Sequence, residues 1–321
     1  MSEFRLSDPG SSLALDPAMA EYLRAYGLPQ PPLARYGYAR IASPQERSRV
    51  ALLTQAWVPA HAIATVLLVH GYSEHAAIYS RLIRDFVEAR FAVIALDLRG
   101  HGLSEGPAGH CPTPLTYAED VEKIVTEIFP NALPNSPLFL WAHSLGAMTA
   151  LQVLHRGRLP VRPAAAAFTS PLLGFPELRG VQKLLAKVAP LLAKAAPALP
   201  VAHGIPPTDL SHDETYLARR HEDPLVRRVA TPRWLESAKA AVAELQHQAG
   251  DFAALCPTLL MLAGDERVTN LGESRRFAFR AYAGQRHKVI EFPGMFHELE
   301  KEPSARPRVV SESIAWFRSH C

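Results

Sequence analysis

LFLWAHSLGA, residues 138–147, passes from an apolar run into a group of small residues around one serine. The run Leu138–Ala142 is typical of a buried strand, and Leu145–His155 has helical spacing. Ser144 therefore lies in a turn between a strand and a helix. A tight turn of this kind exposes the serine hydroxyl at the helix N-terminus, where the helix dipole favours developing negative charge. We predict that Ser144 is a nucleophile.

Similar apolar runs alternate with helical segments along the chain. The other expected buried strands are Ala64–Val69, Phe91–Leu96, Ala164–Thr169 and Thr258–Ala263, and Lys288–Phe292 is expected as a last short strand. The other expected helices are Ile78–Ala89, Thr116–Phe129 and Pro307–Arg318. Apolar runs without alternation are buried on both faces, as in a parallel sheet. We therefore predict an α/β fold with a doubly wound, mostly parallel sheet.

Residues 171–250 interrupt this rhythm, because they contain no buried-strand run. Leu178–Ala189 and Arg233–Gln248 are helix-like pieces within them. A segment of this length is too long for a plain loop in a compact domain. We predict a helical cap, or lid, inserted between residues 41–170 and 251–321, which form the core.

The N-terminal residues 1–40 are rich in Pro, Ser and Ala, and we predict that they form an arm lying on the domain. A short helix is expected at Pro17–Tyr26, with Asp16 as its N-cap. The segment lacks the basic start and unbroken apolar core of a signal peptide. No window approaches the roughly 20 apolar residues of a spanning helix, so we expect a cytoplasmic protein.

Composition excludes several classes of function. Charged residues make up 20% of the 321 residues and the formal net charge is +3, which is too weak a basic bias to indicate nucleic-acid binding. The three cysteines form no CxxC pair, and no His/Cys cluster has metal spacing. We therefore expect reduced thiols, no metal and no cofactor.

Two further segments carry chemistry that fits a serine nucleophile. His70-Gly71-Tyr72-Ser73 follows the first buried strand. The backbone N–H groups of Tyr72 and Leu145 are the expected donors to a tetrahedral oxyanion. His70 itself, at the strand end, is interpreted as structural. His297 follows the last short strand, and we predict that it is the general base.

The acid that orients the base is expected in the loop after Thr258–Ala263, because the chain order is then serine, acid, histidine. This loop contains two adjacent carboxylates, Asp265 and Glu266. Either could hold the imidazole in the correct tautomer and stabilise the imidazolium. The spacing alone leaves both open.

Together these motifs resemble the monoacylglycerol lipase and lysophospholipase branch of the α/β-hydrolases, over about Val50 to Phe317. The pattern is nearest to the bacterial lysophospholipases of this branch. The segments that carry the resemblance are 70–75 (HGYSEH), 97–106 (DLRGHGLSEG), the serine turn 141–147, 223–226 (DPLV) and 294–299 (GMFHEL). The family pattern of an acid two residues before Val or Ile favours Glu266 over Asp265.

The resemblance implies a carboxylic ester hydrolase that cleaves a single-acyl-chain lipid, a lysophospholipid or a monoacylglycerol, through an acyl-enzyme. Glu74 matches a family residue that binds the polar end of the substrate. Ile78 and Glu300 stand where the monoacylglycerol lipases carry Arg and His, so the head group stays open. The alternatives are a short-chain carboxylesterase of small esters and a catalytically inactive lipid-binding member.

The expected helix at 178–189 carries three basic residues on one face, Arg179, Lys183 and Lys187. In one interpretation its apolar stripe packs on the core and the basic residues are solvated. In the other, the helix makes peripheral contact with a membrane or micelle surface, where basic residues meet anionic head groups.

Overall fold

One large sheet organises the chain. The computed structural model describes residues 17–30, 34–42, 49–132, 136–177, 189–282, 284 and 286–321. Within these residues the sheet has eight strands, in the order β1-β2-β4-β3-β5-β6-β9-β10. Their bounds are Ala34–Ala42 (β1), Arg49–Trp57 (β2), Ala64–Val69 (β3), Phe91–Leu96 (β4), Leu138–His143 (β5), Ala165–Thr169 (β6), Thr258–Ala263 (β9) and Lys288–Phe292 (β10). The strands from β4 to β10 in this order are parallel, whereas β1 and β2 are antiparallel to their neighbours. The predicted doubly wound, mostly parallel sheet is confirmed.

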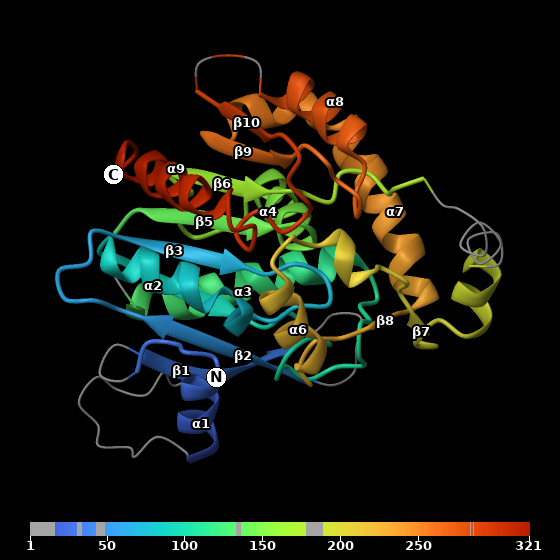
Figure 1. Cartoon of the computed structure of the whole chain (residues 1–321), viewed down its shortest axis with the longest axis horizontal. Helices are drawn as coiled ribbons and strands as arrows, with labels where there is room; N and C mark the ends of the chain where they lie inside the picture. Colours follow the sequence, from blue (N-terminus) through green and yellow to red (C-terminus); the bar gives the residue numbers. More distant parts are fainter. Residues whose placement is uncertain are drawn as a thin grey trace.

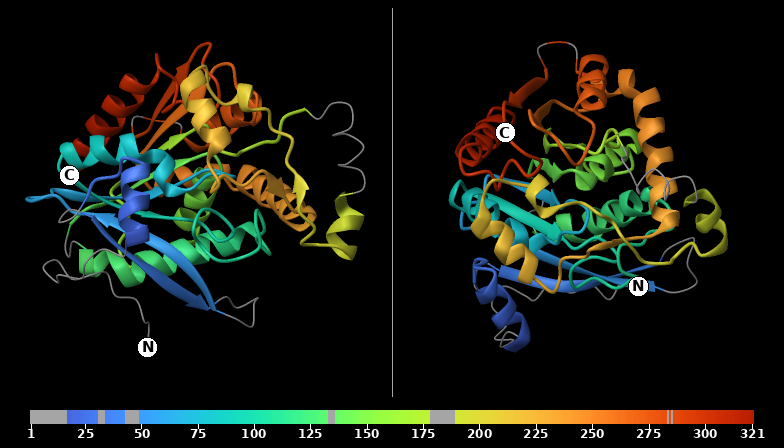
Figure 2. Two further views of the ribbon diagram at one scale, coloured as in Figure 1. Left: turned by 60° about the horizontal axis from the view of Figure 1, so that its bottom comes forward. Right: turned by 45° about the vertical axis from the view of Figure 1, so that its right-hand side comes forward.

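Helices cover both faces of the sheet (Figures 1 and 2). Successive side chains of β3 point to opposite faces, so Val66 and Leu68 pack with one set of helices and Leu67 and Val69 with the other. The first set is α1 (Pro17–Ala25), α2 (Ser80–Glu88) and α9 (Arg306–Arg318). The second set is α3 (Pro114–Ala132), α4 (Leu145–Arg156), α7 (Pro232–His247) and α8 (Leu271–Ala281).

The first two strands were not predicted. β1 begins at Ala34, so the main sheet starts within the segment predicted as an arm. β2 is buried along almost its whole length, but Thr54 and Gln55 interrupt its apolar run. The helix expected at Ile78–Ala89 is a 3-10 turn, η1 (Ala76–Tyr79), followed by α2.

The N-terminal helix is anchored to the domain by apolar contacts. Met19, Tyr22 and Leu23 of α1 are buried in the cluster that contains β2 and α2. Trp57 of β2 donates from its indole nitrogen to the carbonyl oxygen of Pro29, at 3.2 Å. α1 therefore has a fixed position at the β1–β2 end of the molecule (Figure 1).

The region predicted as a cap crosses the end of the sheet where the parallel strands terminate (Figure 1). Its described elements are β7 (Val201–Ala202), η2 (Pro207–Asp209), α6 (Glu214–Glu222), β8 (Val229–Ala230) and α7. β7 and β8 pair with each other, apart from the main sheet. α7 buries Trp234, Ala238 and Leu245 in the core of the sheet domain. The predicted helix at 178–189 lies outside the described residues, except for its last residue.

No helix in the part of the chain that the structure describes is long and apolar enough to cross a membrane. The same residues contain no group of three or more His, Cys, Asp or Glu side chains that could hold a metal ion.

Candidate active site

Ser144 occupies a strained turn between β5 and α4. Its backbone has φ 50° and ψ −114°, a conformation that L-residues seldom adopt. The turn is tight because α4 approaches the neighbouring strand closely: a Cβ on Gly146 would lie 2.2 Å from the carbonyl oxygen of Val69. The small residues of the motif thus allow the sharp turn that aims the serine side chain out of the sheet.

Ser144, His297 and Glu266 form a continuous hydrogen-bonded row. The Ser144 hydroxyl donates to His297 Nε2 at 2.9 Å. His297 Nδ1 donates to the Glu266 carboxylate, 2.8 and 2.9 Å from its two oxygens. Glu266 is itself held by the backbone N–H groups of Val268 at 2.8 Å and Thr269 at 3.0 Å. This is the geometry of a nucleophile, a base and a group that orients the base.

Charge within the row favours an ionised acid and a basic imidazole. Burial acts to raise the pKa of Glu266, but His297 and the two backbone donors outweigh burial and hold that pKa below its usual value. Burial likewise acts to lower the pKa of His297, but Glu266, Glu298 and Glu74 outweigh it and raise that pKa above its usual value. The imidazolium that forms when serine loses its proton is therefore stabilised.

Asp265, the alternative acid, lies elsewhere. Its side chain is 47% exposed and pairs with Arg267 at 2.7 Å. That hydrogen bond lowers the pKa of Asp265. The structure therefore brings Glu266, and not Asp265, against His297.

Tyr72 lines both cavities that Ser144 lines, and Leu145 directly follows Ser144 in the chain. Tyr72 follows β3, and Leu145 is the first residue of α4. Among the hydrogen bonds of the described residues, none is donated by the backbone N–H of either one. Both N–H groups are thus available to an oxyanion.

The side chain of Tyr72 is fixed by the cap. Its ring stacks on Trp234 of α7 at 3.9 Å. Its hydroxyl donates to the carbonyl oxygens of Gly109 at 2.7 Å and Val229 at 3.1 Å. The cap residues therefore help to place the backbone N–H expected to bind the oxyanion, a role that sequence spacing does not reveal.

His70 stabilises the loop after β3, residues 70–75, which carries Tyr72 and is called the oxyanion loop below. Its Nε2 accepts from the backbone N–H of Leu98 at 2.9 Å, so its Nδ1 carries the proton and donates to the Gly71 carbonyl at 2.7 Å. Burial lowers the pKa of His70, which keeps the ring neutral. This arrangement fits the structural role expected for it.

A large apolar cavity of about 870 Å³ opens on Ser144. This volume lies within the range of small-molecule binding sites. The apolar side chains of its wall come from the loop after β6, from the cap and from α8. They include Leu172, Phe175, Leu192, Trp234, Leu235 and Leu271.

A second, much smaller cavity of about 30 Å³ is lined by both Ser144 and His297, with room for roughly two water molecules. Its wall includes three charged-type side chains, Glu74, Arg220 and Glu298. Glu74 Oε2 accepts from the backbone N–H of Gly71 at 2.7 Å, whereas its Oε1 has no hydrogen-bond partner. Burial and the charge of Glu298 raise the pKa of Glu74.

Glu300 is buried and does not line this cavity. Its Oε2 lies 4.0 Å from His143 Nδ1.

Arg220 was not predicted as a site residue. It comes from α6, far from the other site residues in sequence, and its Nε lies 3.6 Å from Glu298.

The fold and the site together define an α/β-hydrolase of the serine hydrolase class. A family model described as serine aminopeptidase, S33, matches residues 60–304, more than half of the chain. The chain belongs to this family.

Named relatives indicate which branch of the α/β-hydrolases this chain resembles. It is 30% identical over 278 residues to a monoacylglycerol lipase of Mycolicibacterium smegmatis, covering 84% of this chain and 94% of the relative. It is 27% identical over 285 residues to lysophospholipase L2 of Escherichia coli, covering 80% and 81%. A solved structure, the monoacylglycerol lipase of Paleococcus ferrophilus, superposes with a TM-score of 0.73 at 26% identity, covering 84% of this chain and 99% of that one. The resemblance inferred from the sequence motifs is confirmed.

Proposed function

We propose that this protein hydrolyses the carboxylic ester of a single-acyl-chain lipid, a lysophospholipid or a monoacylglycerol, through an acyl-enzyme. The observation that carries the proposal is the hydrogen-bonded row Ser144–His297–Glu266 at the mouth of an apolar cavity of about 870 Å³. Relatives named for both activities support the same substrate class.

In the proposed reaction His297 takes the proton of Ser144 as the serine oxygen attacks the ester carbonyl. The backbone N–H groups of Tyr72 and Leu145 bind the oxyanion. His297 then gives its proton to the leaving alcohol, and the acyl group remains on Ser144. Water, deprotonated by His297, attacks this acyl-enzyme, which releases the fatty acid and restores the serine. Glu266 keeps its charge and orients the imidazole throughout.

The two cavities suggest how the substrate lies. The acyl chain occupies the large cavity, because most of the surface of its wall is apolar. The leaving alcohol faces the small cavity, where Glu74 Oε1 has no hydrogen-bond partner and can pair with a hydroxyl group. Glu74 is thus proposed to bind the polar end of the substrate.

The test is hydrolysis of a panel of esters by the wild type and by Ser144→Ala. The panel contains lysophosphatidylcholine, a long-chain monoacylglycerol, p-nitrophenyl esters from acetate to palmitate, and an aminoacyl p-nitroanilide for the peptidase activity in the family description. We expect the long single-chain esters to be cleaved best. A preference for acetate would support the short-chain carboxylesterase. No cleavage of any ester would support an inactive lipid-binding protein.

Peripheral contact with a membrane or micelle is a separate part of the proposal. It rests on the sequence of residues 178–189, which lie almost wholly outside the described residues. A single-chain amphiphile must be taken from an aggregate, and a basic amphipathic segment would favour that transfer.

A further inference from the structure

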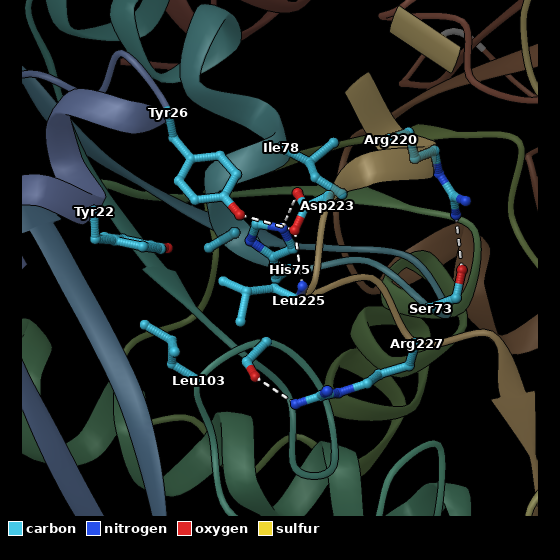
Figure 3. A network of polar contacts seen from close by, with 12 residues as sticks. Tyr22, Tyr26, Ser73, His75, Ile78, Leu103, Arg220, Asp223, Leu225 and Arg227 are labelled. Carbon is cyan, nitrogen blue, oxygen red and sulfur yellow. Dashed lines mark hydrogen bonds and ion pairs between the residues drawn. The ribbon is translucent and has the colours of Figure 1, made fainter. Parts of the chain in front are cut away.

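The carboxylate of Asp223 connects three separate parts of the chain (Figure 3). It accepts from the Tyr26 hydroxyl at 2.8 Å, from His75 Nε2 at 2.9 Å and from the backbone N–H of Leu225 at 2.8 Å. Tyr26 follows the N-terminal helix α1, His75 lies in the loop after β3, and Asp223 follows α6 in the cap. One carboxylate therefore ties the N-terminal segment and the cap to the oxyanion loop.

His75 and Asp223 have little solvent access in this network, whereas Tyr26 is partly exposed. The side chain of His75 is fully buried and that of Asp223 is 9% exposed. Burial acts to raise the pKa of Asp223, but its three hydrogen bonds and the charge of His75 hold that pKa below its usual value. Burial and Asp223 raise the pKa of Tyr26, so its phenol remains a donor. Hydrogen bonds to a buried carboxylate are among the stronger ones in proteins.

The same cap segment also holds Ser73, the residue directly after Tyr72. Ser73 has φ 64°, a left-handed conformation that is strained for any residue except glycine. Arg220 Nη2 donates to the Ser73 hydroxyl at 2.8 Å (Figure 3). The backbone N–H of Arg227 donates to the Ser73 carbonyl at 3.0 Å. A strained conformation persists where its surroundings fix it. The cap therefore fixes the backbone between Tyr72 and His75 at both residues 73 and 75.

We propose that Tyr26, Asp223 and His75 are positioning residues for the oxyanion hole: they hold the loop that places the backbone N–H of Tyr72. This inference rests on the proposed ester hydrolysis. It assigns the N-terminal segment a part in catalysis, although Tyr26 is remote from the ester. The reason is geometric, because an oxyanion donor stabilises the transition state only where it reaches the developing charge.

The experiment measures kcat and KM with a p-nitrophenyl ester for Tyr26→Phe, Asp223→Asn and the double variant, with the melting temperature of each. Tyr26→Phe removes only the hydroxyl. We expect kcat to fall about 3- to 10-fold in Tyr26→Phe and about 10- to 100-fold in Asp223→Asn, with KM changed by less than about twofold. Since Tyr26 acts through Asp223, the double variant should be no slower than Asp223→Asn alone.

A neighbouring tyrosine on α1 provides the matched control. Tyr22 is buried in the same cluster, but its hydroxyl accepts from Gln55 and is not part of the network. Tyr22→Phe should change kcat by less than about twofold. If it lowers kcat as much as Tyr26→Phe does, the effect comes from general docking of the helix and the proposal is overturned.

A transition-state analogue separates positioning from simple stabilisation of the fold. Affinity for a long-chain trifluoromethyl ketone, whose adduct carries an oxyanion, should fall by the same factor as kcat in each variant. Affinity for the product fatty acid should not change. A lower melting temperature with unchanged kcat and ketone affinity overturns the proposal. A wild type without esterase activity overturns the proposed function and this inference together, whereas an active wild type with an unaffected Tyr26→Phe overturns this inference alone.

Discussion

Two buried histidine–carboxylate pairs lie near each other at the end of the sheet, and they differ in the group that completes each one. His297 contacts Glu266 with one ring nitrogen and Ser144 with the other. His75 contacts Asp223 with one ring nitrogen, while its other nitrogen has no hydrogen-bond partner. The hydroxyl of Tyr26 donates to the other oxygen of Asp223, at 2.8 Å.

The difference between the two pairs indicates what makes a histidine–carboxylate pair chemically active. The first pair has a nucleophile on its free side, and Ser144 and His297 line a cavity. The second pair has no nucleophile, and neither His75 nor Asp223 is in the wall of the two cavities described above. A histidine and a carboxylate at 2.9 Å therefore give orientation in both cases, whereas access to substrate distinguishes catalysis from positioning.

Removal of the nucleophile should have the largest effect. Ser144→Ala deletes a hydroxyl that contributes little packing, so the fold should be retained. We expect kcat to fall by on the order of 10⁴-fold or more. Steady-state hydrolysis of a long-chain p-nitrophenyl ester measures this loss of kcat. If more than a tenth of the activity remains, Ser144 is not the nucleophile.

The acid offers a matched pair of adjacent substitutions. Glu266→Gln should lower kcat by about 10³- to 10⁴-fold, because the imidazole loses the carboxylate that orients it. Asp265→Asn breaks only an exposed pair with Arg267 and should change kcat by less than about twofold. The reverse ranking would assign the acid to Asp265.

The pH dependence of Glu266→Gln tests whether Glu266 acts on His297. The base must be neutral to accept the serine proton, so kcat/KM should rise as pH increases through the pKa of His297. That pKa is raised above its usual value, chiefly by Glu266 against the opposing effect of burial. In Glu266→Gln the rise should therefore move to lower pH in the residual activity. A midpoint that stays in place would show that Glu266 does not act on His297.

The apolar cavity should set acyl-chain preference. Leu235→Trp adds bulk to its wall and should lower kcat/KM for a palmitate ester by roughly 10-fold relative to an acetate ester. Leu199→Trp is the control, because Leu199 is 46% exposed and is not in the cavity wall. Equal losses for both esters in Leu235→Trp would place the acyl chain elsewhere.

The basic residues of the 178–189 segment should have the smallest effect. Each basic residue near an anionic surface adds about 1 kcal/mol to binding. Co-sedimentation of Ser144→Ala with anionic vesicles should be weakened by salt and by changing Arg179, Lys183 and Lys187 to Gln. Binding that is equal or absent for anionic and zwitterionic vesicles, at low and high salt, would leave these residues with a solvated role only.

Most of the parallel part of the sheet could be predicted from the sequence because its strands from β3 to β9 are largely apolar runs. β2 could not, since Thr54 and Gln55 are buried within it and obscure the pattern. The serine turn and the loop with the acid were recognisable because each directly follows such a run. Which carboxylate faces His297 depends on side-chain direction, and spacing left that choice open.

The second pair was beyond sequence reasoning for a different reason. Its contacts join residues 26 and 75 to residue 223, at separations of 197 and 148 positions. The motifs around His75 and Asp223 were recognised separately, but nothing local indicates that the two side chains meet. Arg220 and Tyr26 likewise acquire their partners only when the cap and α1 fold against the loop after β3.

The central claim, that Ser144 carries the acyl group of a lipid ester, is tested most directly by intact-protein mass spectrometry. The protein is mixed with a long-chain p-nitrophenyl ester, quenched in acid within the first turnover, and the labelled peptide is sequenced. The account predicts a mass increase equal to the acyl group, located on Ser144 and absent from Ser144→Ala. Hydrolysis of the ester without any acyl adduct, or an adduct on another residue, would contradict it.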